Sequence, residues 1–201
     1  MRRIICGLAT FLACCSVAGA PAVQDGDIIF HPSKSSQSRA IQRATHSPYS
    51  HMGLILYRGG KPYVLEAVST VRYTPLSDWI RRGTDGHYVV KRLRDAQATL
   101  TPAAIDKLRK AAEAFEGRQY DLTFEWSDTR IYCSELVWKA YDRGLGIQIG
   151  TLQHLRNFDL SDAEVNVKMR ERYGEHVPLD ELVISPAAMV SASNLITVAE
   201  R

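Results

Sequence analysis

The chain has 201 residues, with 25 Lys and Arg against 22 Asp and Glu, so its formal net charge is +3. The sequence contains no basic block and no aromatic-rich basic strand, which argues against a nucleic-acid-binding protein. It also contains no internal repeat or low-complexity tract, and its length fits a globular domain with a substantial core.

The N-terminal segment has the features of a secretory signal peptide. The basic Met1–Arg3 precedes the apolar Ile4–Cys15, which is too short to cross a bilayer, and small residues follow. Two small-x-small cleavage sites are present. We predict cleavage after Ala22, because cleavage after Ala20 would leave Pro21 next to the scissile bond. We therefore expect an exported protein of the periplasm or cell envelope.

Removal of residues 1–22 would leave one domain at residues 23–201. Arg2 and Arg3 would leave with the signal peptide, so 23 basic residues would face 22 acidic ones and the net charge would be +1. No later apolar stretch is long enough to form a transmembrane anchor. The sequence carries no signal for the oligomeric state.

The leader also contains three of the four cysteines, so Cys133 would be the single cysteine of the mature protein. A lipoprotein cut before Cys14 or Cys15 is an alternative, although Phe11 fits such a site poorly. One cysteine cannot form an internal disulfide, and a free thiol in an oxidising compartment needs an explanation. Cys133 is therefore either a buried, inert side chain or a reactive group, and its occurrence alone leaves both open.

The first half of the sequence predicts mainly strands. Gly26 and Asp27 form a turn before a short apolar strand, and two strands joined by a Gly-Gly turn form an antiparallel hairpin with His51 and Glu66 on its arms. The predicted elements in chain order are a strand at 28–30, a short helix capped by Ser38, hairpin strands at 51–57 and 63–68, a helix at 76–81 and a strand at 88–93.

The second half predicts mainly helices. Thr101 is a cap residue and Pro102 occupies the first helical position, and the following helix should stop at Gly117. Another helix should run from Cys133 to Gly144, and a more polar one should span 162–173. These patterns together predict an α+β fold, with a small antiparallel sheet packed against helices.

Three residues have the chemistry of an activated nucleophile. A cysteine reacts as the thiolate, and a helix N-terminus such as that predicted for Cys133 favours this form. The free amides there, including that of Ser134, are suited to stabilising an oxyanion. On the hairpin, His51 is suited to act as the base and Glu66 to orient it.

The sequence resembles the NlpC-type papain-like cysteine peptidases in their circularly permuted form, most closely the YiiX/YebB-like branch. Ordinary members present the cysteine block before the histidine strand, and this chain carries similar blocks in reverse order over nearly all of residues 23–201. The similar blocks are 26–30 (GDIIF), 50–54 (SHMGL), 64–67 (VLEA), 117–121 (GRQYD) and 132–137 (YCSELV), with branch-specific segments at 35–38 and 44–47.

The resemblance implies a permuted papain-like fold with a small, partly barrel-like antiparallel sheet. It implies Cys133 as nucleophile, His51 as base and Glu66 as the third polar group, with Tyr120 beside the thiol as an oxyanion donor. Ordinary members often have His, Asn or Gln where Glu66 stands and Asp where Tyr132 stands. We interpret both differences as properties of the permuted branch.

The expected function is hydrolysis of amide bonds through a thioester intermediate, on cell-wall peptides or other short peptides, without a cofactor. One alternative is a thiol-dependent lipid acyl hydrolase or acyltransferase, because some permuted relatives resemble retinol acyltransferase. Another is a module that binds a peptide or amino acid without turning it over.

The remaining histidines and tryptophans have ordinary structural explanations. His46 and His51 are five residues apart, but no further ligand spacing completes a metal site, so no metal is predicted. Histidines 31, 87, 154 and 176 should lie on the surface or in loops. Tryptophans 79, 126 and 138 should lie in the core or line the groove.

Overall fold

The computed structural model describes residues 22–201. The predicted signal peptide, apart from Ala22, lies outside the described residues, so its cleavage remains a prediction. None of the helices that these residues form has the length and the apolar composition needed to cross a membrane.

A six-stranded antiparallel sheet forms the centre of the molecule, with strand order β4-β3-β2-β1-β5-β8. This sheet with its flanking helices confirms the predicted α+β fold. A separate two-stranded ribbon pairs β6 with β7. The strands are β1 (Ile28–His31), β2 (His51–Arg58), β3 (Lys61–Ala67), β4 (Val71–Pro75), β5 (Val89–Leu93), β6 (Gln153–His154), β7 (Leu182–Val183) and β8 (Leu195–Glu200).

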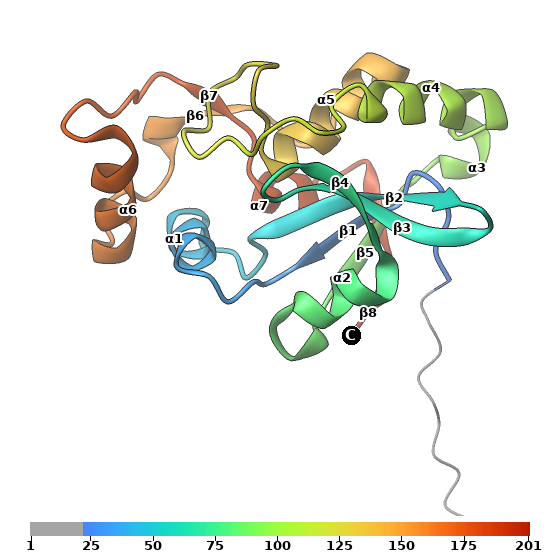
Figure 1. Ribbon diagram of the computed structural model, residues 1–201, viewed down its shortest axis with the longest axis horizontal. Coiled ribbons are helices and arrows are strands. Elements are labelled where there is room, and N and C mark those ends of the chain that lie inside the picture. The colour runs from blue at the N-terminus through green and yellow to red at the C-terminus, as the bar shows by residue number, and fades with distance from the viewer. Residues whose placement is uncertain (1–21) are drawn as a thin grey trace, which may run out of the picture.

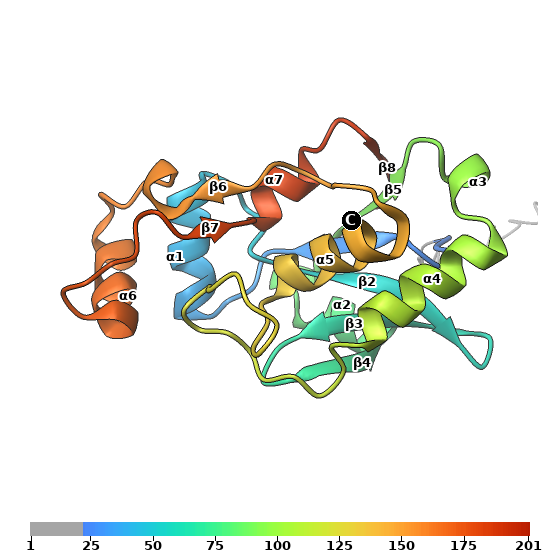
Figure 2. The same cartoon turned by 90° about the horizontal axis from the view of Figure 1, so that it is seen from above.

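Helices cover both faces of the sheet (Figures 1 and 2). Helices α4 and α5 lie on one face and α2 lies on the other. The helices are α1 (Ser36–Thr45), α2 (Leu76–Arg82), α3 (Ala96–Thr99), α4 (Pro102–Glu113), α5 (Cys133–Leu145), α6 (Ala163–Tyr173) and α7 (Pro186–Val190), with short 3-10 turns at Thr84–Gly86 and Leu155–Asn157.

The alternation of side chains along the strands separates two apolar clusters. On β1, Ile28 and Phe30 pack toward α4 and α5, whereas Ile29 packs toward α2. Trp79 of α2 is fully buried in the second cluster. The three apolar positions of β1 are therefore committed to one helix layer or the other, and its polar side chain, His31, lies at the end of the strand.

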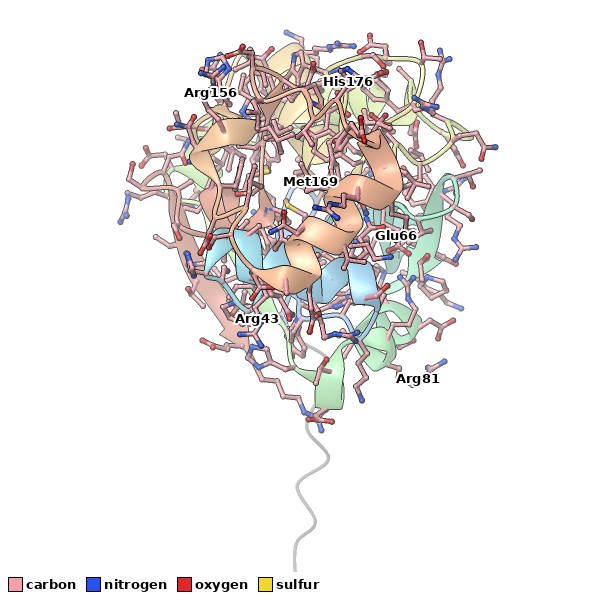
Figure 3. The ribbon with its side chains drawn as sticks, turned by 90° about the vertical axis from the view of Figure 1, so that its left-hand side faces the viewer. Arg43, Glu66, Arg81, Arg156, Met169 and His176 are labelled. Atoms are coloured by element: carbon pink, nitrogen blue, oxygen red, sulfur yellow. The ribbon has the colours of Figure 1, made fainter. Side chains whose placement is uncertain are left out.

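Helix α1 and helix α6 lie together at one end of the sheet (Figures 1 and 3). An ion pair joins Arg39 to Glu164 across them, with a nitrogen–oxygen distance of 3.0 Å. A second pair joins Arg43 to Asp162 at 3.9 Å. Exposed ion pairs of this kind contribute little stability, so we expect the packing of side chains to stabilise the contact between the two helices more than the ion pairs do.

The predicted start of α1 and the predicted end of α5 are wrong, for local reasons. The cap of α1 is Ser35, whose hydroxyl accepts a hydrogen bond from the amide of Ser38 at 3.1 Å, so Ser38 lies inside the first turn. Helix α5 continues past Gly144 and is closed by Gly146, which has φ 67°. Gly144 instead permits close packing, because a Cβ there would lie 2.9 Å from the Cα of Leu108.

The start of α4 is as predicted, but its end is earlier. The hydroxyl of Thr101 accepts a hydrogen bond from the amide of Ala104 at 3.3 Å, and Pro102 is the first helical residue. The helix ends at Glu113. Gly117, which has φ 82°, reverses the chain after an intervening turn rather than closing the helix directly.

Candidate active site

Cys133 is the first residue of α5 and its side chain is only 2% exposed. The neighbouring Ser134 is also buried, and its hydroxyl donates a hydrogen bond of 2.7 Å to the carbonyl of Ile184. The hydroxyl of Ser134 is therefore engaged. The first amides of a helix have no partner within the helix, so the amide of Ser134 is one of the donors beside the thiol.

The hairpin of β2 and β3 brings His51 and Glu66 together. Nε2 of His51 and Oε2 of Glu66 are 2.7 Å apart. A glycine at position 53 allows the two arms to approach, because a Cβ there would lie 2.3 Å from Cγ1 of Val64 and 3.3 Å from Cβ of Glu66. The three residues with the predicted catalytic chemistry are neighbours, since Cys133 is close enough to His51 to raise the pKa of its imidazole.

Glu66 is a fully buried carboxylate that accepts hydrogen bonds from four side chains. Besides His51, the donors are the hydroxyl of Thr74 at 2.6 Å, the indole of Trp79 at 2.9 Å, and the guanidinium of Arg82. Burial alone would raise the pKa of Glu66, but its hydrogen bond and charge interaction with His51, together with Thr74 and Arg82, lower that pKa to about 2.

The other three donors were not predicted from the sequence. Trp79 and Arg82 are three residues apart and therefore lie on one face of α2, while Thr74 lies on β4 beside β3. The sequence does contain a signal for the two helical donors. A tryptophan and an arginine lie on one face of a short helix, and this helix follows the hairpin that carries the glutamate.

The imidazole of His51 is held in its charged form. Burial acts to lower the pKa of His51, but hydrogen bonds to Cys133 and Glu66, and their negative charges, raise that pKa to about 9. Because Nε2 is bonded to Glu66, the remaining nitrogen Nδ1 is the one available to Cys133. This arrangement favours the imidazolium form of His51.

His31 is buried, contrary to the predicted surface position. It is 2% exposed on β1, next to His51 on β2, and its ring meets Trp79 edge-on at a centroid distance of 4.1 Å. Burial and the positive charge of His51 lower the pKa of His31 to about 3. The apolar pattern of the preceding residues 28–30 continues one position further than the sequence analysis assumed.

The neutral tautomer of His31 follows from its single hydrogen bond. Nδ1 lies 3.1 Å from the carbonyl oxygen of Pro32 and must donate to it, which leaves Nε2 as an unprotonated acceptor. That nitrogen is buried and has no hydrogen-bond partner. His31 is therefore a neutral imidazole next to His51.

Tyr120 lies beside Cys133, and its hydroxyl accepts a hydrogen bond of 2.8 Å from the side-chain amide of Gln37. Burial, followed by the charge of Cys133, raises the pKa of Tyr120 well above its usual value. Gln37 donates to the hydroxyl oxygen of Tyr120, so the hydroxyl proton of Tyr120 can be donated to another acceptor. Gln37 is a further residue of the site to which the sequence alone assigned no role.

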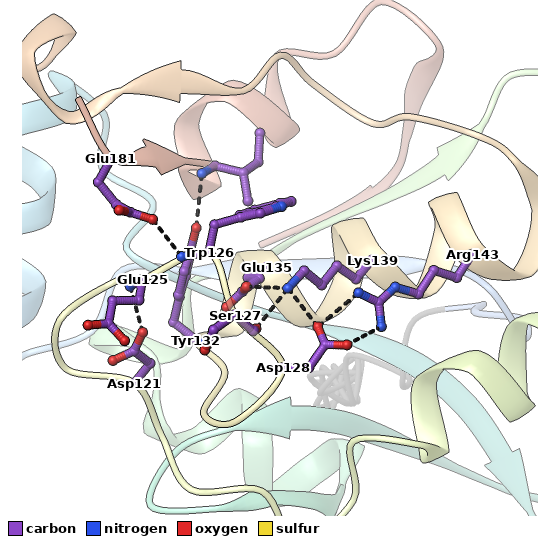
Figure 4. A network of polar contacts seen from close by, with 11 residues as sticks. Asp121, Glu125, Trp126, Ser127, Asp128, Tyr132, Glu135, Lys139, Arg143 and Glu181 are labelled. Atoms are coloured by element: carbon purple, nitrogen blue, oxygen red, sulfur yellow. Dashed lines mark hydrogen bonds and ion pairs between the residues drawn. The ribbon is translucent and has the colours of Figure 1, made fainter.

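Buried acidic groups fix the loop that leads to Cys133 (Figure 4). Asp121 accepts hydrogen bonds from the amides of Thr123 and Glu125, at 2.9 and 2.7 Å. Glu135 lies 2.7 Å from Nζ of Lys139. Burial raises the pKa of Glu135 to about 7, although Lys139 acts in the opposite direction. Nζ of Lys139 also donates hydrogen bonds to the carbonyl of Ser127 and to Asp128, at 2.8 and 2.9 Å, and these contacts hold the loop against α5.

Two cavities meet at this point. A polar cleft of about 470 Å³ and a nearly apolar pocket of about 90 Å³ share Ile41 and Tyr120 in their walls. The polar cleft is lined by His31, Ser33, Ser35, Gln37, Ser38, Ile41, Ser50, His51, Ala67, Val68, Ser69, Arg82, Gln119, Tyr120 and Leu122. The apolar pocket is lined by Ile41, Ala44, Thr45, Tyr120, Phe124, Tyr132, Cys133, Ser134, Phe158, Val183, Ile184, Ser185 and Pro186.

Comparison with known proteins confirms the predicted resemblance. A family model described as permuted papain-like amidase enzyme, YaeF/YiiX, C92 family, matches residues 22–199. The chain is 50% identical over 177 residues to "Uncharacterized protein YiiX" of Escherichia coli (strain K12), which covers 88% of this chain and 86% of that protein. A crystal structure described as metalloprotein yiiX from Escherichia coli O157:H7 is 50% identical, with a TM-score of 0.85, and covers 89% of this chain and 97% of that one.

The buried, neutral His31 predicts a specific loss of stability in mild acid. The unfolded chain binds a proton below pH 6.5, whereas folded His31 does so only near pH 3, so stability falls as the pH drops below 6.5. One proton corresponds to about 1.4 kcal/mol per pH unit, or about 2 kcal/mol between pH 7.5 and 5. We expect His31→Phe to remove this slope in urea unfolding curves measured between those pH values.

The exposed His176 offers a matched control. His176→Phe should follow the wild-type pH dependence. A His31→Phe variant that loses stability with the wild-type slope would show that His31 is not held neutral in the folded protein.

Proposed function

Since the chain belongs to the YaeF/YiiX, C92 family of permuted papain-like amidase enzymes, we propose that it hydrolyses an amide bond with Cys133 as nucleophile, His51 as general acid and base, and Glu66 as the group that orients His51. The observation that supports this assignment is that His51 interacts both with Cys133, at the N-terminus of α5, and with the buried Glu66.

In the acylation step, the thiolate of Cys133 attacks the carbonyl carbon of the amide. A carbon–sulfur bond forms, the carbon–nitrogen bond breaks, and the proton of the His51 imidazolium passes to the departing amine. Glu66 stays ionised throughout, because the pKa of its carboxyl is about 2. It stabilises the imidazolium and holds the ring in one orientation.

In the deacylation step, neutral His51 takes a proton from water, and the resulting hydroxide adds to the thioester carbonyl. The carbon–sulfur bond breaks, the carboxylic acid leaves, and the thiolate–imidazolium pair is restored. The amide of Ser134 and the free proton of Tyr120 are suited to stabilise the negative oxygen in both steps.

The substrate and the compartment belong to the same proposal. The predicted signal peptide supports export to the periplasm or cell envelope, where short peptides of the cell wall are available. The side chains of Ser69, Arg82 and Gln119 in the cleft beside His51 support a hydrophilic substrate of this kind. The proposed mechanism needs no cofactor.

A metal has no part in the proposal. The related crystal structure is described as that of a metalloprotein. Among residues 22–201 of this chain, however, no three His, Cys, Asp or Glu side chains are gathered where they could share a metal ion.

A second candidate function is acyl transfer from, or hydrolysis of, a lipid ester. The nearly apolar pocket beside Cys133 favours it, because such a wall is compatible with a hydrocarbon chain. The same thioester chemistry would apply, with an alcohol in place of the amine.

The first prediction concerns the reactivity of Cys133. At pH 7 we expect iodoacetamide to alkylate Cys133 about tenfold faster in the wild type than in His51→Ala, because His51 supplies the charge that stabilises the thiolate. Peptide mass spectrometry locates and quantifies the label. The difference should shrink near pH 10, where an ordinary cysteine ionises unaided.

An unreactive thiol, or a labelling rate indifferent to His51, would contradict the activated nucleophile. It would support a binding module instead, with Cys133 buried as an inert side chain.

The second prediction concerns the charge of Glu66. Replacing Glu66 by Gln keeps the shape of the side chain but removes its negative charge, so the pKa of His51 should fall from about 9 by at least about one unit. Carbon-detected NMR titration of the imidazole ring, assigned with His51→Ala, measures this directly. Thr74→Val is the matched control, because it removes one hydrogen bond and leaves the charge in place.

If Glu66→Gln titrates like the wild type, then Glu66 does not control the protonation of His51, and its assigned role is wrong.

The third prediction separates the two candidate functions. Purified protein should release peptide fragments from muropeptides and should leave phospholipid vesicles unchanged, as measured by chromatography coupled to mass spectrometry. A Cys133→Ser variant controls for contaminating activity. Acyl release from the vesicles alone would favour the lipid function and contradict amide hydrolysis.

A further inference from the structure

We propose that Gln37 is a positioning residue of the site, and that it directs the hydroxyl proton of Tyr120 toward the oxygen of the carbonyl group that Cys133 attacks. The inference rests on the proposed thiol chemistry and adds to it a residue of α1. The contact behind it is the hydrogen bond of 2.8 Å from the side-chain amide of Gln37 to the hydroxyl oxygen of Tyr120.

The backbone of Tyr120 is held on both sides, but its backbone contacts do not set the direction of its hydroxyl proton. The amide of Tyr120 donates a hydrogen bond of 3.0 Å to the carbonyl of Ser69. Tyr120 also forms a parallel bridge with Ile131, in the loop that precedes Cys133, and it lines both cavities of the site. A hydroxyl proton rotates to suit its surroundings, so a further contact is needed to select one direction.

Gln37 supplies this contact, because its side-chain nitrogen can only donate. A glutamine nitrogen carries two hydrogens and cannot accept a hydroxyl proton, so the proton of Tyr120 must point away from Gln37. Burial, followed by the charge of Cys133, raises the pKa of Tyr120 well above its usual value, and the hydroxyl therefore keeps this proton. Among residues 22–201, Gln37 is the one hydrogen-bond partner of the hydroxyl, which leaves the proton for a substrate oxygen.

The position of Gln37 depends on how α1 is anchored. Gln37 lies in the first turn of α1, where the hydroxyl of Ser35 accepts a hydrogen bond of 3.1 Å from the amide of Ser38. Near the other end of the helix, the amide of Asp159 donates to the carbonyl of Ala44 at 3.0 Å. Together with the two ion pairs between α1 and α6, these contacts hold the amide of Gln37 against Tyr120.

The test compares two reactions of the same thiol. Acylation of Cys133 by 4-nitrophenyl acetate passes through a tetrahedral oxyanion, whereas alkylation by iodoacetamide displaces iodide without forming one. The burst of 4-nitrophenolate measures the rate of acylation, and intact mass measures the rate of alkylation. A change in thiolate content alters both rates alike, so the ratio of acylation to alkylation reports the oxyanion donor.

Two substitutions of Gln37 should have different effects on this ratio. Gln37→Glu reverses the hydrogen bond, because a carboxylate accepts the proton of Tyr120 and withdraws it from the reacting oxygen. We expect the ratio to fall at least about tenfold, since the loss of one oxyanion donor costs about a hundredfold or more in rate. Gln37→Leu leaves the proton divided between two directions in the ring plane, so the ratio should fall only about twofold.

Gln42→Glu is the matched control. It places the same charge on α1, on a side chain that donates to the carbonyl of Pro48 and lines neither cavity, so it should keep the wild-type ratio. Tyr120→Phe removes the hydroxyl proton altogether. In that background neither substitution of Gln37 should lower the ratio further, whereas a merely structural role of Gln37 would lower it there as well.

An unchanged ratio in Gln37→Glu, or an equal fall in the Tyr120→Phe background, would overturn the proposal. The outcome does not depend on amide cleavage. The expected fall in a protein that releases no fragment from muropeptides would support the role of Gln37 and contradict the amidase function. Cleavage of muropeptides with an unchanged ratio would contradict the role of Gln37 alone.

Discussion

The buried carboxylate of Glu66 is the interaction on which the geometry of the site depends. An ionised group with no exposed surface is stable only when its lone pairs are satisfied and its charge is compensated. Its four donors come from β2, β4 and α2, so one carboxylate joins the hairpin to the helix beneath it. The orientation of His51 is therefore fixed by the same contacts that hold this side of the sheet together.

Cys133, the proposed nucleophile, is fixed independently, by groups on the opposite face. Helix α5 packs on the sheet beside α4, and the hydroxyl of Tyr141 donates to the carbonyl of Gly26 at the start of β1. Asp121 fixes the first turn of the loop that precedes Cys133, and Lys139 of α5 donates to the carbonyl of Ser127 in the same loop. Two rigid bodies, distant in sequence, thus meet at Cys133 and His51. Such a site does not depend on the order of its segments along the chain, which is consistent with a circular permutation of the fold.

The sequence predicted the elements well, because strand alternation and cap residues are local signals. The hairpin carrying His51 and Glu66 and the helix beginning at Cys133 both follow from such patterns. The contributions of Trp79, Arg82 and Gln37 did not, since they depend on how α2 and α1 pack against the sheet. The misplaced His31 has the same cause: a histidine at a strand end is buried or exposed according to the helix that covers it, and its own neighbours in sequence do not determine which.

Charge balance explains why a neutral His31 matters to the proposed chemistry. Glu66 and Arg82 form a pair of opposite charges, and proton transfer from Cys133 to His51 creates a second such pair, so the buried site has no net charge before or after the transfer. A protonated His31 would add an uncompensated positive charge beside His51 and would oppose the imidazolium. Its burial against Trp79 prevents this. A neutral His31 thereby permits the proposed ion pair between Cys133 and His51 to form without a further counterion.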